Sequence, residues 1–331
     1  MNDTPRVGLI GCGQQGHLLT DALRRIPGLT LVACSDPRAE AVSTIADTDV
    51  AGFADYRAMI ETSRPDAVIV ATPHAALATA AAFSASAGCH VFCEKPLALT
   101  ATEAQPVLAA AKAANVKLMV AYCLRYDSLR RRMKELIADG AVGTIVAATA
   151  GKGGPPHPGG WLAQPEAGGG QLLFVGSHLV DQVLWLVGQP VTRVFAEIEW
   201  SARNRTDETS VFTLRFADGA LAHLDCSQAA HAYYDYVDVM GTHGRVRADW
   251  RPSPMLSIHS ERRPEFREPT TVRPIEKDTI AMYVAELDEF AGAIREDREP
   301  AITGQDGLRV LTVLDAVVAS ARRGDSVALD G

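Results

Sequence analysis

A glycine-rich turn near the start of the chain constrains the fold more than any other feature. Residues 6–10 form a short, mostly apolar run, and Gly11, Gly13 and Gly16 follow it with the spacing G-x-G-x-x-G. Apolar residues at helical spacing come directly afterwards. Glycines at these positions allow a tight turn, leave room for a pyrophosphate and let the helix pack closely on the strand. This order predicts a dinucleotide site at the free N–H groups of the helix start, with an incidental glycine turn as the alternative.

An acidic residue at the end of the second apolar run supports that prediction. Residues 29–35 are mostly apolar and lead to Asp36, twenty residues beyond Gly16. A carboxylate at this distance accepts hydrogen bonds from the ribose hydroxyls of adenosine and repels a 2′-phosphate. The sequence therefore predicts NAD as the cofactor. Arg38 lies two residues further on and could pair with a phosphate, which keeps NADP as the alternative.

The composition excludes several classes of function. The chain has 331 residues, enough for two domains, and a net charge of −8 that argues against nucleic acid or an anionic membrane as the main partner. No uninterrupted apolar run is long enough to span a bilayer, and the N-terminus shows no signal-peptide pattern. Six cysteines are scattered without a Cys-x-x-Cys pair, so we expect a cytoplasmic protein with reduced thiols and no metal site.

Strands and helices alternate up to residue 122, with helices predicted over residues 38–46, 55–62 and 75–87, and from a capping box at Thr100 and Glu103 to residue 114. This alternation predicts a parallel, doubly wound sheet, and hence a Rossmann domain over residues 1–123. Ligands of such sheets bind at the carboxyl ends of the strands. We therefore expect one cleft to be lined by the residues that follow the strands: Gly11, Asp36, Thr72, Pro73, Glu94, Lys95 and Arg125.

The pattern changes after residue 124. A helix is predicted over residues 127–139, and its run Arg130-Arg131-Arg132 is expected to be a solvated face. A Gly/Pro loop and the triple glycine 168–170 precede a helix over residues 171–187. Residues 191–273 alternate as strands, with Asp218-Gly219 as a hairpin turn between two of them, and predict a mostly antiparallel, open sheet. Two helices close the chain, so we expect residues 124–331 to form a second α/β domain with a large open sheet.

Two residues have positions that suit acid–base chemistry. Lys95 ends a buried strand, where its ammonium could hydrogen-bond a substrate hydroxyl and take part in proton transfer; the alternative is a surface lysine paired with Glu94. His178 shares a helix face with Phe174 and Asp181, and could act as a general base near neutral pH. A core histidine capped by Asp181 is the equally weighted alternative.

Three loop residues are weaker candidates. His157 and Trp161 lie in the Gly/Pro loop, where they could line a sugar-sized pocket or simply fix the loop. His74 follows Thr72-Pro73 and could touch the cofactor, although loop histidines without a role are common.

Taken together, these motifs resemble the Gfo/Idh/MocA family of oxidoreductases, which includes glucose–fructose oxidoreductase and inositol dehydrogenase. The resemblance runs from end to end in one order: the glycine turn, Ser35-Asp36, Thr72-Pro73, Glu94-Lys95-Pro96, Arg125-Tyr126, Trp161, Gly168-Gly169-Gly170, Gly176-Ser177-His178 with Asp181, and the segments 286–295 and 306–311.

The resemblance implies a Rossmann domain, NAD(H) or NADP(H), and Lys95 with His178 as the catalytic set. Its expected cofactor-binding residues are Gly11, Gly13, Gln14, Gln15, Gly16, Asp36, Arg38, Thr72, Pro73, His74, Glu94, Lys95 and Arg125. Its expected substrate-binding residues are Lys95, Arg125, His157, Trp161, Phe174 and His178. The open sheet implies a homodimer or homotetramer.

Two departures from the family pattern make the expected pocket less polar. Relatives typically have an aspartate one helical turn before the histidine, and this chain has Phe174. A benzyl group cannot accept a proton, and without the carboxylate His178 should be less basic. The arginine that often follows the tryptophan is replaced by Leu162.

The expected function is hydride transfer between NAD(P) and a secondary alcohol or ketone of a sugar, cyclitol or related polyol. One alternative is sugar-cleaving lyase or glycosidase-type chemistry that recycles a bound NAD internally. The other is a dinucleotide-binding regulator without activity, which the replacement of the acid by Phe174 keeps open.

Overall fold

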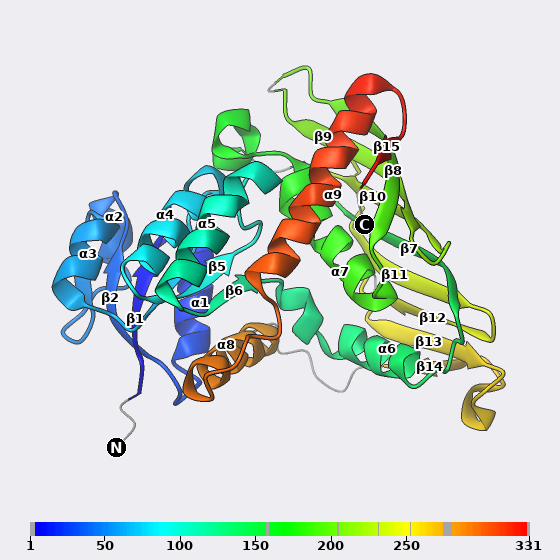
Figure 1. Cartoon of the computed structure of the whole chain (residues 1–331), viewed down its shortest axis with the longest axis horizontal. Helices are drawn as coiled ribbons and strands as arrows, with labels where there is room; N and C mark the ends of the chain where they lie inside the picture. The colour runs from blue at the N-terminus through cyan, green and yellow to red at the C-terminus, as the bar shows by residue number, and fades with distance from the viewer. Residues whose placement is uncertain are drawn as a thin grey trace. The chain divides into compact units, whose positions relative to one another are not determined.

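The chain forms two compact units. The computed structural model describes residues 4–156, 159–203, 205–230, 232–251, 253–273 and 280–329 (Figure 1). The first unit is Met1–Cys123 with Asp278–Leu311, and the second is Leu124–Lys277 with Thr312–Gly331. The sequence pattern had assigned everything after residue 123 to one domain. Residues 278–311 instead pack with the first unit, where the ring of Phe290 lies 5.6 Å from that of Phe92.

The first unit contains the expected parallel, doubly wound sheet. Its strand order is β3-β2-β1-β4-β5-β6, and all the pairs are parallel. The order reverses between β1 and β4, which is where such sheets bind dinucleotides. The bounds are β1 (Arg6–Ile10), β2 (Thr30–Ser35), β3 (Ala51–Phe53), β4 (Ala67–Val70), β5 (His90–Glu94) and β6 (Leu118–Ala121).

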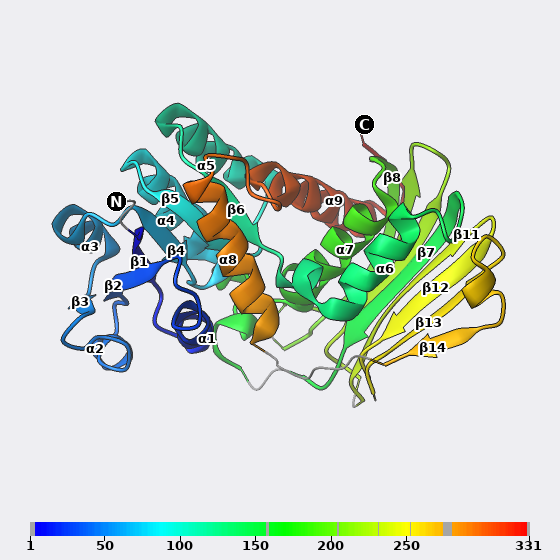
Figure 2. The same cartoon turned by 90° about the horizontal axis from the view of Figure 1, so that it is seen from below.

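Helices flank this sheet, and most begin within one residue of the predicted positions. They are α1 (Gln14–Leu23), α2 (Ala39–Val42), α3 (Tyr56–Ser63), α4 (His74–Ser86), α5 (Ala101–Ala114), α8 (Ala281–Arg295) and the start of α9 (Gly304–Arg323). The helix expected over residues 38–46 is only the single turn α2. The predicted N-cap of α5 is confirmed, since Thr100 Oγ1 accepts a hydrogen bond of 3.2 Å from Glu103 N. Helix α8 lies beside α1 (Figure 2).

The second unit is built on a sheet in the order β14-β13-β12-β11-β7-β10-β9-β8-β15. All the recorded pairings are antiparallel except that of β7 with β10, which confirms the expected mostly antiparallel sheet. Asp218-Gly219 forms the predicted hairpin turn, with Gly219 at φ +94°. The bounds are β7 (Ile145–Gly153), β8 (Val191–Trp200), β9 (Asp207–Phe216), β10 (Leu221–Ser227), β11 (Tyr234–Gly241), β12 (Gly244–Asp249), β13 (Met255–Ser260), β14 (Thr270–Val272) and β15 (Val327–Ala328).

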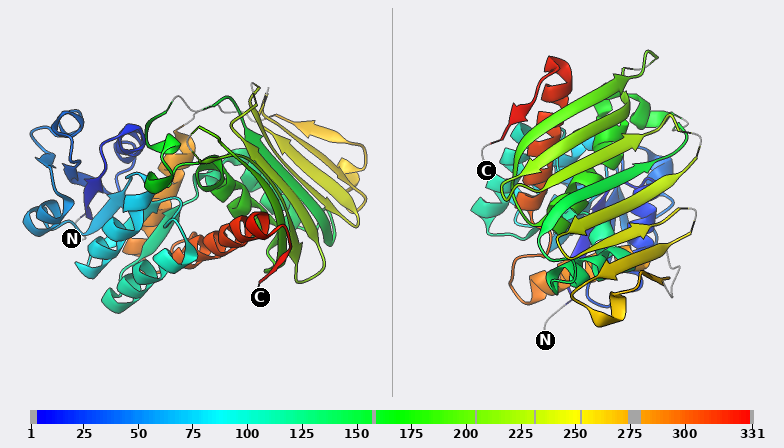
Figure 3. Two further views of the ribbon diagram at one scale, coloured as in Figure 1. Left: turned by 90° about the horizontal axis from the view of Figure 1, so that it is seen from above. Right: turned by 90° about the vertical axis from the view of Figure 1, so that its right-hand side faces the viewer.

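Helices cover one face of this sheet. These are α6 (Ser128–Ala138), α7 (Ser177–Val187) and the last part of α9, while no helix of the described residues lies on the opposite face (Figure 3). Residues 165–187 form a stretch that is long and apolar enough to cross a membrane. However, 67% of its most apolar part is buried inside the protein. That degree of burial is typical of a core helix.

Arg130 corrects one expectation from the sequence. The basic run was expected to be solvated, and Arg131 and Arg132 are exposed, but Arg130 is 1% exposed. Its guanidinium donates to Gln182 Oε1 and to Asp235 Oδ1, both at 2.7 Å, and lies 3.3 Å from the centre of the Trp250 ring. The Arg130 charge can be buried here because the guanidinium is hydrogen-bonded to a carboxylate and an amide and lies against an aromatic ring.

We expect Arg130→Ala to lower the free energy of unfolding by about 3–5 kcal/mol, because it removes one partner of a buried ion pair and empties its volume. Arg132→Ala, two residues away on an exposed pair with Glu135, should cost less than about 0.5 kcal/mol. Urea denaturation of both variants measures this difference. Equal losses would show that the Arg130 contacts do not stabilise the unit.

Candidate functional site

The glycine turn forms a cradle at the start of α1. Gly11 has φ +99°, and a Cβ there would lie 2.4 Å from Ala71 O; a Cβ on Gly16 would lie 2.1 Å from Gly11 O. Both glycines are therefore required by close backbone packing. A Cβ on Gly13 would meet only Arg38 Nη2, at 4.0 Å, so space is open above this residue.

The start of α1 offers free donors to an anion. Gly13 is the N-cap and makes no side-chain cap, and no acidic residue occupies the first turn. Gln14 is exposed and Gln15 is half-buried. Free N–H groups, the positive end of the helix dipole and open space above Gly13 together suit a pyrophosphate. The residues present thus fit a dinucleotide.

Asp36 is held ionised at the end of β2. Cys12 N donates to its Oδ2 at 3.0 Å, and the Arg38 guanidinium donates to both oxygens at 2.9 and 3.0 Å. Burial disfavours the charged form, but the hydrogen bonds from Arg38 and Cys12 outweigh it and lower the pKa of Asp36. From the sequence, Arg38 was expected only as a phosphate partner; the structure adds its two side-chain hydrogen bonds to Asp36.

The end of β4 lies against the glycine turn. Thr72 N is 3.1 Å from the position that a Cβ on Gly11 would take. Pro73 is the N-cap of α4 and His74 is its first residue, 3% exposed. Thr72 Oγ1 donates to Pro73 O at 3.2 Å.

Glu94 is the last residue of β5 and Lys95 follows it. Both are 8% exposed, which is unlike a surface lysine. Gln15 Nε2, from the first turn of α1, donates to Glu94 Oε1 at 2.6 Å, and Lys95 N donates to Oε2 at 3.2 Å. Burial raises the pKa of Glu94, opposed by the Lys95 ammonium and these hydrogen bonds. The Glu94 carboxylate thus joins the ends of β5 and α1.

In the second unit, Trp161, Phe174 and His178 are all half-buried. The Trp161 and Phe174 rings meet edge to face, with centroids 6.5 Å apart and an interplanar angle of 86°. Residues Leu172–Gly176 form a π-helical turn directly before α7, which the sequence did not predict. Such turns are frequent at functional sites because they rotate the side chains that they carry.

Asp207 anchors that turn, a role that the sequence did not predict. Its Oδ2 accepts a hydrogen bond of 2.5 Å from Leu172 N. Gly170 has φ +117°, and a Cβ there would lie 2.1 Å from Asp207 Oδ1, so only glycine fits. Burial raises the pKa of Asp207 to about 6. No local pattern around residue 207 indicates this contact, because its partner is 35 residues away.

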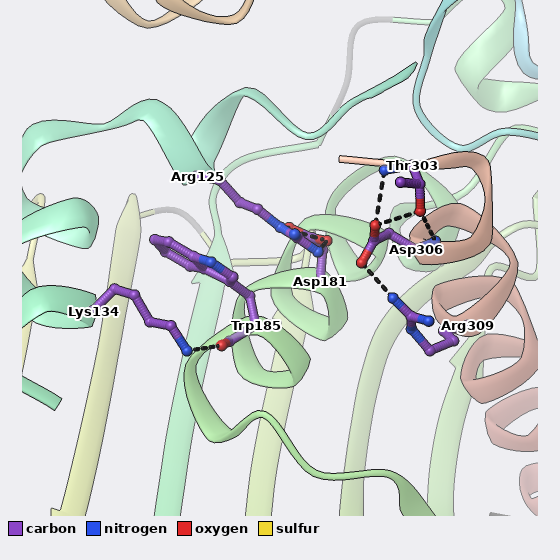
Figure 4. Close-up of polar contacts among 7 residues, drawn as sticks. All are labelled: Arg125, Lys134, Asp181, Trp185, Thr303, Asp306 and Arg309. Carbon is purple, nitrogen blue, oxygen red and sulfur yellow. Dashed lines mark hydrogen bonds and ion pairs between the residues drawn. The ribbon is translucent and has the colours of Figure 1, made fainter. Parts of the chain in front are cut away.

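Arg125 and Asp181 form a buried ion pair (Figure 4). Arg125 Nη2 donates to Asp181 Oδ1 at 2.7 Å and Nε donates to Oδ2 at 3.1 Å; the side chains are 11% and 1% exposed. The guanidinium also lies 5.9 Å from the Trp185 ring centre. The Arg125 guanidinium therefore donates its hydrogen bonds to Asp181, although Arg125 was expected to contact the cofactor and substrate. His157 lies outside the described residues.

We expect Gly13→Ala to weaken NAD binding by roughly tenfold or more, or about 1.4 kcal/mol, because a methyl group would occupy the space offered to the pyrophosphate. The melting temperature should change by only a few degrees, since Gly13 has φ −81° and a Cβ there would meet only Arg38 Nη2, at 4.0 Å. Gly16→Ala should instead lower the melting temperature, since its Cβ would strike Gly11 O. Calorimetric titration and thermal melting measure both effects. Unchanged NAD affinity in Gly13→Ala would show that the coenzyme does not bind in the cradle.

The chain is similar over nearly its whole length to known oxidoreductases. It is 29% identical to "Uncharacterized oxidoreductase YrbE" of Bacillus subtilis, with 98% of this chain and 96% of that protein covered. It is 28% identical to "Myo-inositol 2-dehydrogenase" of Thermotoga maritima, with 98% of each covered. The solved structure of GenD2 from gentamicin A biosynthesis, in complex with NAD, superposes with a TM-score of 0.88 at 26% identity and covers 100% of this chain and 98% of its own.

Both halves of the chain match models of one family. Residues 5–122 match the model described as "Oxidoreductase family, NAD-binding Rossmann fold". Residues 130–247 match the model described as "GFO/IDH/MocA C-terminal domain". With the doubly wound sheet, the open glycine cradle and Asp36 at the end of β2, these matches establish that the chain belongs to the Gfo/Idh/MocA family of oxidoreductases.

Proposed function

We propose that the chain transfers a hydride between NAD and a secondary alcohol or ketone of a sugar, cyclitol or related polyol. In the oxidative direction the carbinol C–H bond gives its hydride to the coenzyme, the hydroxyl proton passes to a base, and a ketone forms. The observation that carries this proposal is the open cradle above Gly13 in the same unit as the buried Lys95. The activity of the myo-inositol 2-dehydrogenase relative supports the polyol class.

Lys95 and His178 have distinct roles in this proposal. The Lys95 ammonium hydrogen-bonds the reacting hydroxyl, lowers its pKa and takes part in proton transfer. Its position after β5, fixed through the Glu94 contacts with Gln15, supports this role. His178 acts as the base, or orients the hydroxyl where the missing carboxylate leaves it too weakly basic.

NAD is the coenzyme that the contacts of Asp36 favour. The ionised carboxylate would repel a 2′-phosphate and can receive the ribose hydroxyls. The Arg38 guanidinium, which could otherwise attract that phosphate, already makes two hydrogen bonds to Asp36. To bind the 2′-phosphate of NADP, Arg38 would have to break its hydrogen bonds to Asp36, so NADP is the less favoured alternative.

Phe174 and Trp161 support a substrate with an apolar face. The edge-to-face rings form an aromatic surface on the unit that contains His178, and Leu162 follows Trp161 in the sequence. Carbohydrates present C–H groups to aromatic rings, so a ring face poor in hydroxyls would pack here. This argues for a deoxy, anhydro or similarly substituted sugar over a fully hydroxylated inositol.

The bare face of the second sheet supports a homodimer or homotetramer. Strand alternation and register place Phe195, Val211 and Leu221 on that face, where they are 42%, 38% and 49% exposed. A second copy of the sheet would cover them. A cytoplasmic location is part of the proposal, supported by six free, buried cysteines.

We expect Lys95→Ala to lower kcat by about 10²-fold or more, because it removes the group that lowers the pKa of the substrate hydroxyl. NAD affinity, measured by calorimetry, should persist. Lys112→Ala, on α5, serves as the control and should leave turnover unchanged. Near-normal turnover of Lys95→Ala over a panel of sugars and cyclitols would exclude Lys95 from the mechanism.

We expect Phe174→Asp to shift specificity towards hydroxyl-rich polyols. The carboxylate would accept hydrogen bonds and make His178 more basic, so kcat/KM for a sugar should rise by about tenfold relative to that for its deoxy analogue. Phe174→Leu, which stays apolar, should keep the original preference. NAD reduction with matched sugar and deoxy-sugar pairs measures the ratio; an unchanged ratio in Phe174→Asp would separate Phe174 from substrate recognition.

A further inference from the structure

A buried carboxyl group in the first unit has no partner that stabilises its charge. Glu286, on α8, is 0% exposed, and neither of its carboxylate oxygens has a hydrogen-bond partner among the described residues. Glu289, three residues further along the same helix, pairs instead with Arg298 at the surface. An ionised carboxylate without donors is very costly to bury, so Glu286 is stable here as the neutral acid.

Glu94, at the end of β5, is the carboxyl group whose charge acts on Glu286. Burial and the charge of Glu94 both raise the pKa of Glu286. Glu94 accepts hydrogen bonds from Gln15 and from the Lys95 backbone amide, and the Lys95 ammonium favours its charged form. Among the described residues, no donor reaches either carboxylate oxygen of Glu286. When two buried carboxyl groups repel each other, the one with hydrogen-bond donors and a nearby cation ionises, and the other stays protonated. Glu94 is therefore the member of the pair that carries the charge, and Glu286 is the member that keeps the proton.

The groups around the pair are few and can be named by element. Glu94 ends β5 and Lys95 follows it, Cys123 comes after β6, and Tyr283 lies on α8 itself. Burial raises the pKa of both Cys123 and Tyr283, so both are neutral near pH 7. The charge that acts on Glu286 is thus that of Glu94, on which the Lys95 ammonium acts in turn.

This pair belongs to the half of the sheet that would receive the nicotinamide. A doubly wound sheet binds one mononucleotide on each half, and Asp36, directly after β2, assigns the adenosine to β1–β3. The nicotinamide half is then β4–β6, where Glu94 ends β5 and accepts a hydrogen bond from Gln15 at the start of α1. The nicotinamide ring is cationic when oxidised and neutral when reduced.

We propose that Glu286 keeps its proton in the free protein and releases it to solvent when oxidised coenzyme binds, so that the Glu94–Glu286 pair balances the charge of the nicotinamide ring. This inference rests on the proposed function, since it requires NAD binding. A nearby cation favours the ionised form of an acid, and by linkage the ionised acid favours the cation. NAD⁺ affinity should therefore rise with pH, by at most about tenfold per pH unit for one released proton, while NADH affinity should lack this dependence.

Calorimetric titration in two buffers of different ionisation enthalpy measures the protons released on binding. For the wild-type protein near pH 7 we expect up to one more proton released with NAD⁺ than with NADH. Glu286→Gln, which keeps the shape but cannot ionise, should lose this difference and flatten the pH dependence of NAD⁺ affinity. Glu289→Gln, on the same helix, should behave like the wild type.

Equal proton release by the wild-type protein and Glu286→Gln would overturn the inference, as would equal release with NAD⁺ and NADH in the wild type. Failure of either coenzyme to bind the wild type would instead overturn the proposed function itself. The two failures are therefore distinguishable.

Thermal stability provides a measurement that needs no coenzyme. The unfolded chain loses the Glu286 proton near its ordinary pKa, while the folded chain keeps it, so the stability of the wild type should fall as pH rises above that value. Glu286→Gln should lack this component, which amounts to at most about a tenfold change in the folding constant per pH unit. Identical pH dependence in the two proteins would show that Glu286 is ionised when folded, and would overturn the proposal.

Discussion

The close packing of Gly16 on the carbonyl of Gly11 is the constraint on which the first unit depends. A Cβ at residue 16 would lie 2.1 Å from that oxygen, so α1 starts as near to β1 as backbone atoms allow. Gly11 N also donates to Ser35 O at 2.8 Å, and its Cα faces Ala71 O. One turn thereby joins the ends of β1, β2 and β4. The same packing directs the free N–H groups of α1 to the sheet edge where Asp36, Glu94 and Lys95 emerge.

In the second unit, the helical turn before α7 begins with a hydrogen bond to a carboxylate of the protein itself, that of Asp207. Asp207 accepts the N–H of Leu172 at the start of the turn that leads into α7, and Gly170 has no side chain to obstruct it. The first turn of α1 has neither a side-chain cap nor an acidic residue. The contrast has a physical meaning: an internal carboxylate fixes one helix, while the other keeps its donors for an external anion. The uncapped start of α1 thus fits the proposed coenzyme site, whereas the start held by Asp207 has a structural role.

Local sequence signals predicted much of this structure because their partners are close along the chain. The glycine spacing, the Thr100 cap and the Asp218-Gly219 turn all act within a few residues. The contacts that were missed join distant segments: Arg130 with Asp235 is separated by 105 positions, and Leu172 with Asp207 by 35. A basic run is usually solvated, and only the folded sheet brings Asp235 and Trp250 to Arg130. The very short strands β14 and β15 depend in the same way on a neighbouring strand, since their few residues have little periodicity of their own.

The buried charges separate structural sites from a site of proton exchange. Arg125 with Asp181 and Arg130 with Asp235 are each closed by hydrogen bonds within the second unit, so a change in protonation would break the packing. Among the described residues, Glu286 is the buried carboxyl whose two oxygens both lack such bonds. A group left unsatisfied in an otherwise satisfied core is costly, and such exceptions occur mainly where function requires them. Because neither of its charge states is fixed by a partner, Glu286 is free to respond to a charge that arrives from outside, and its neighbour Glu94 lies where the nicotinamide would bring one.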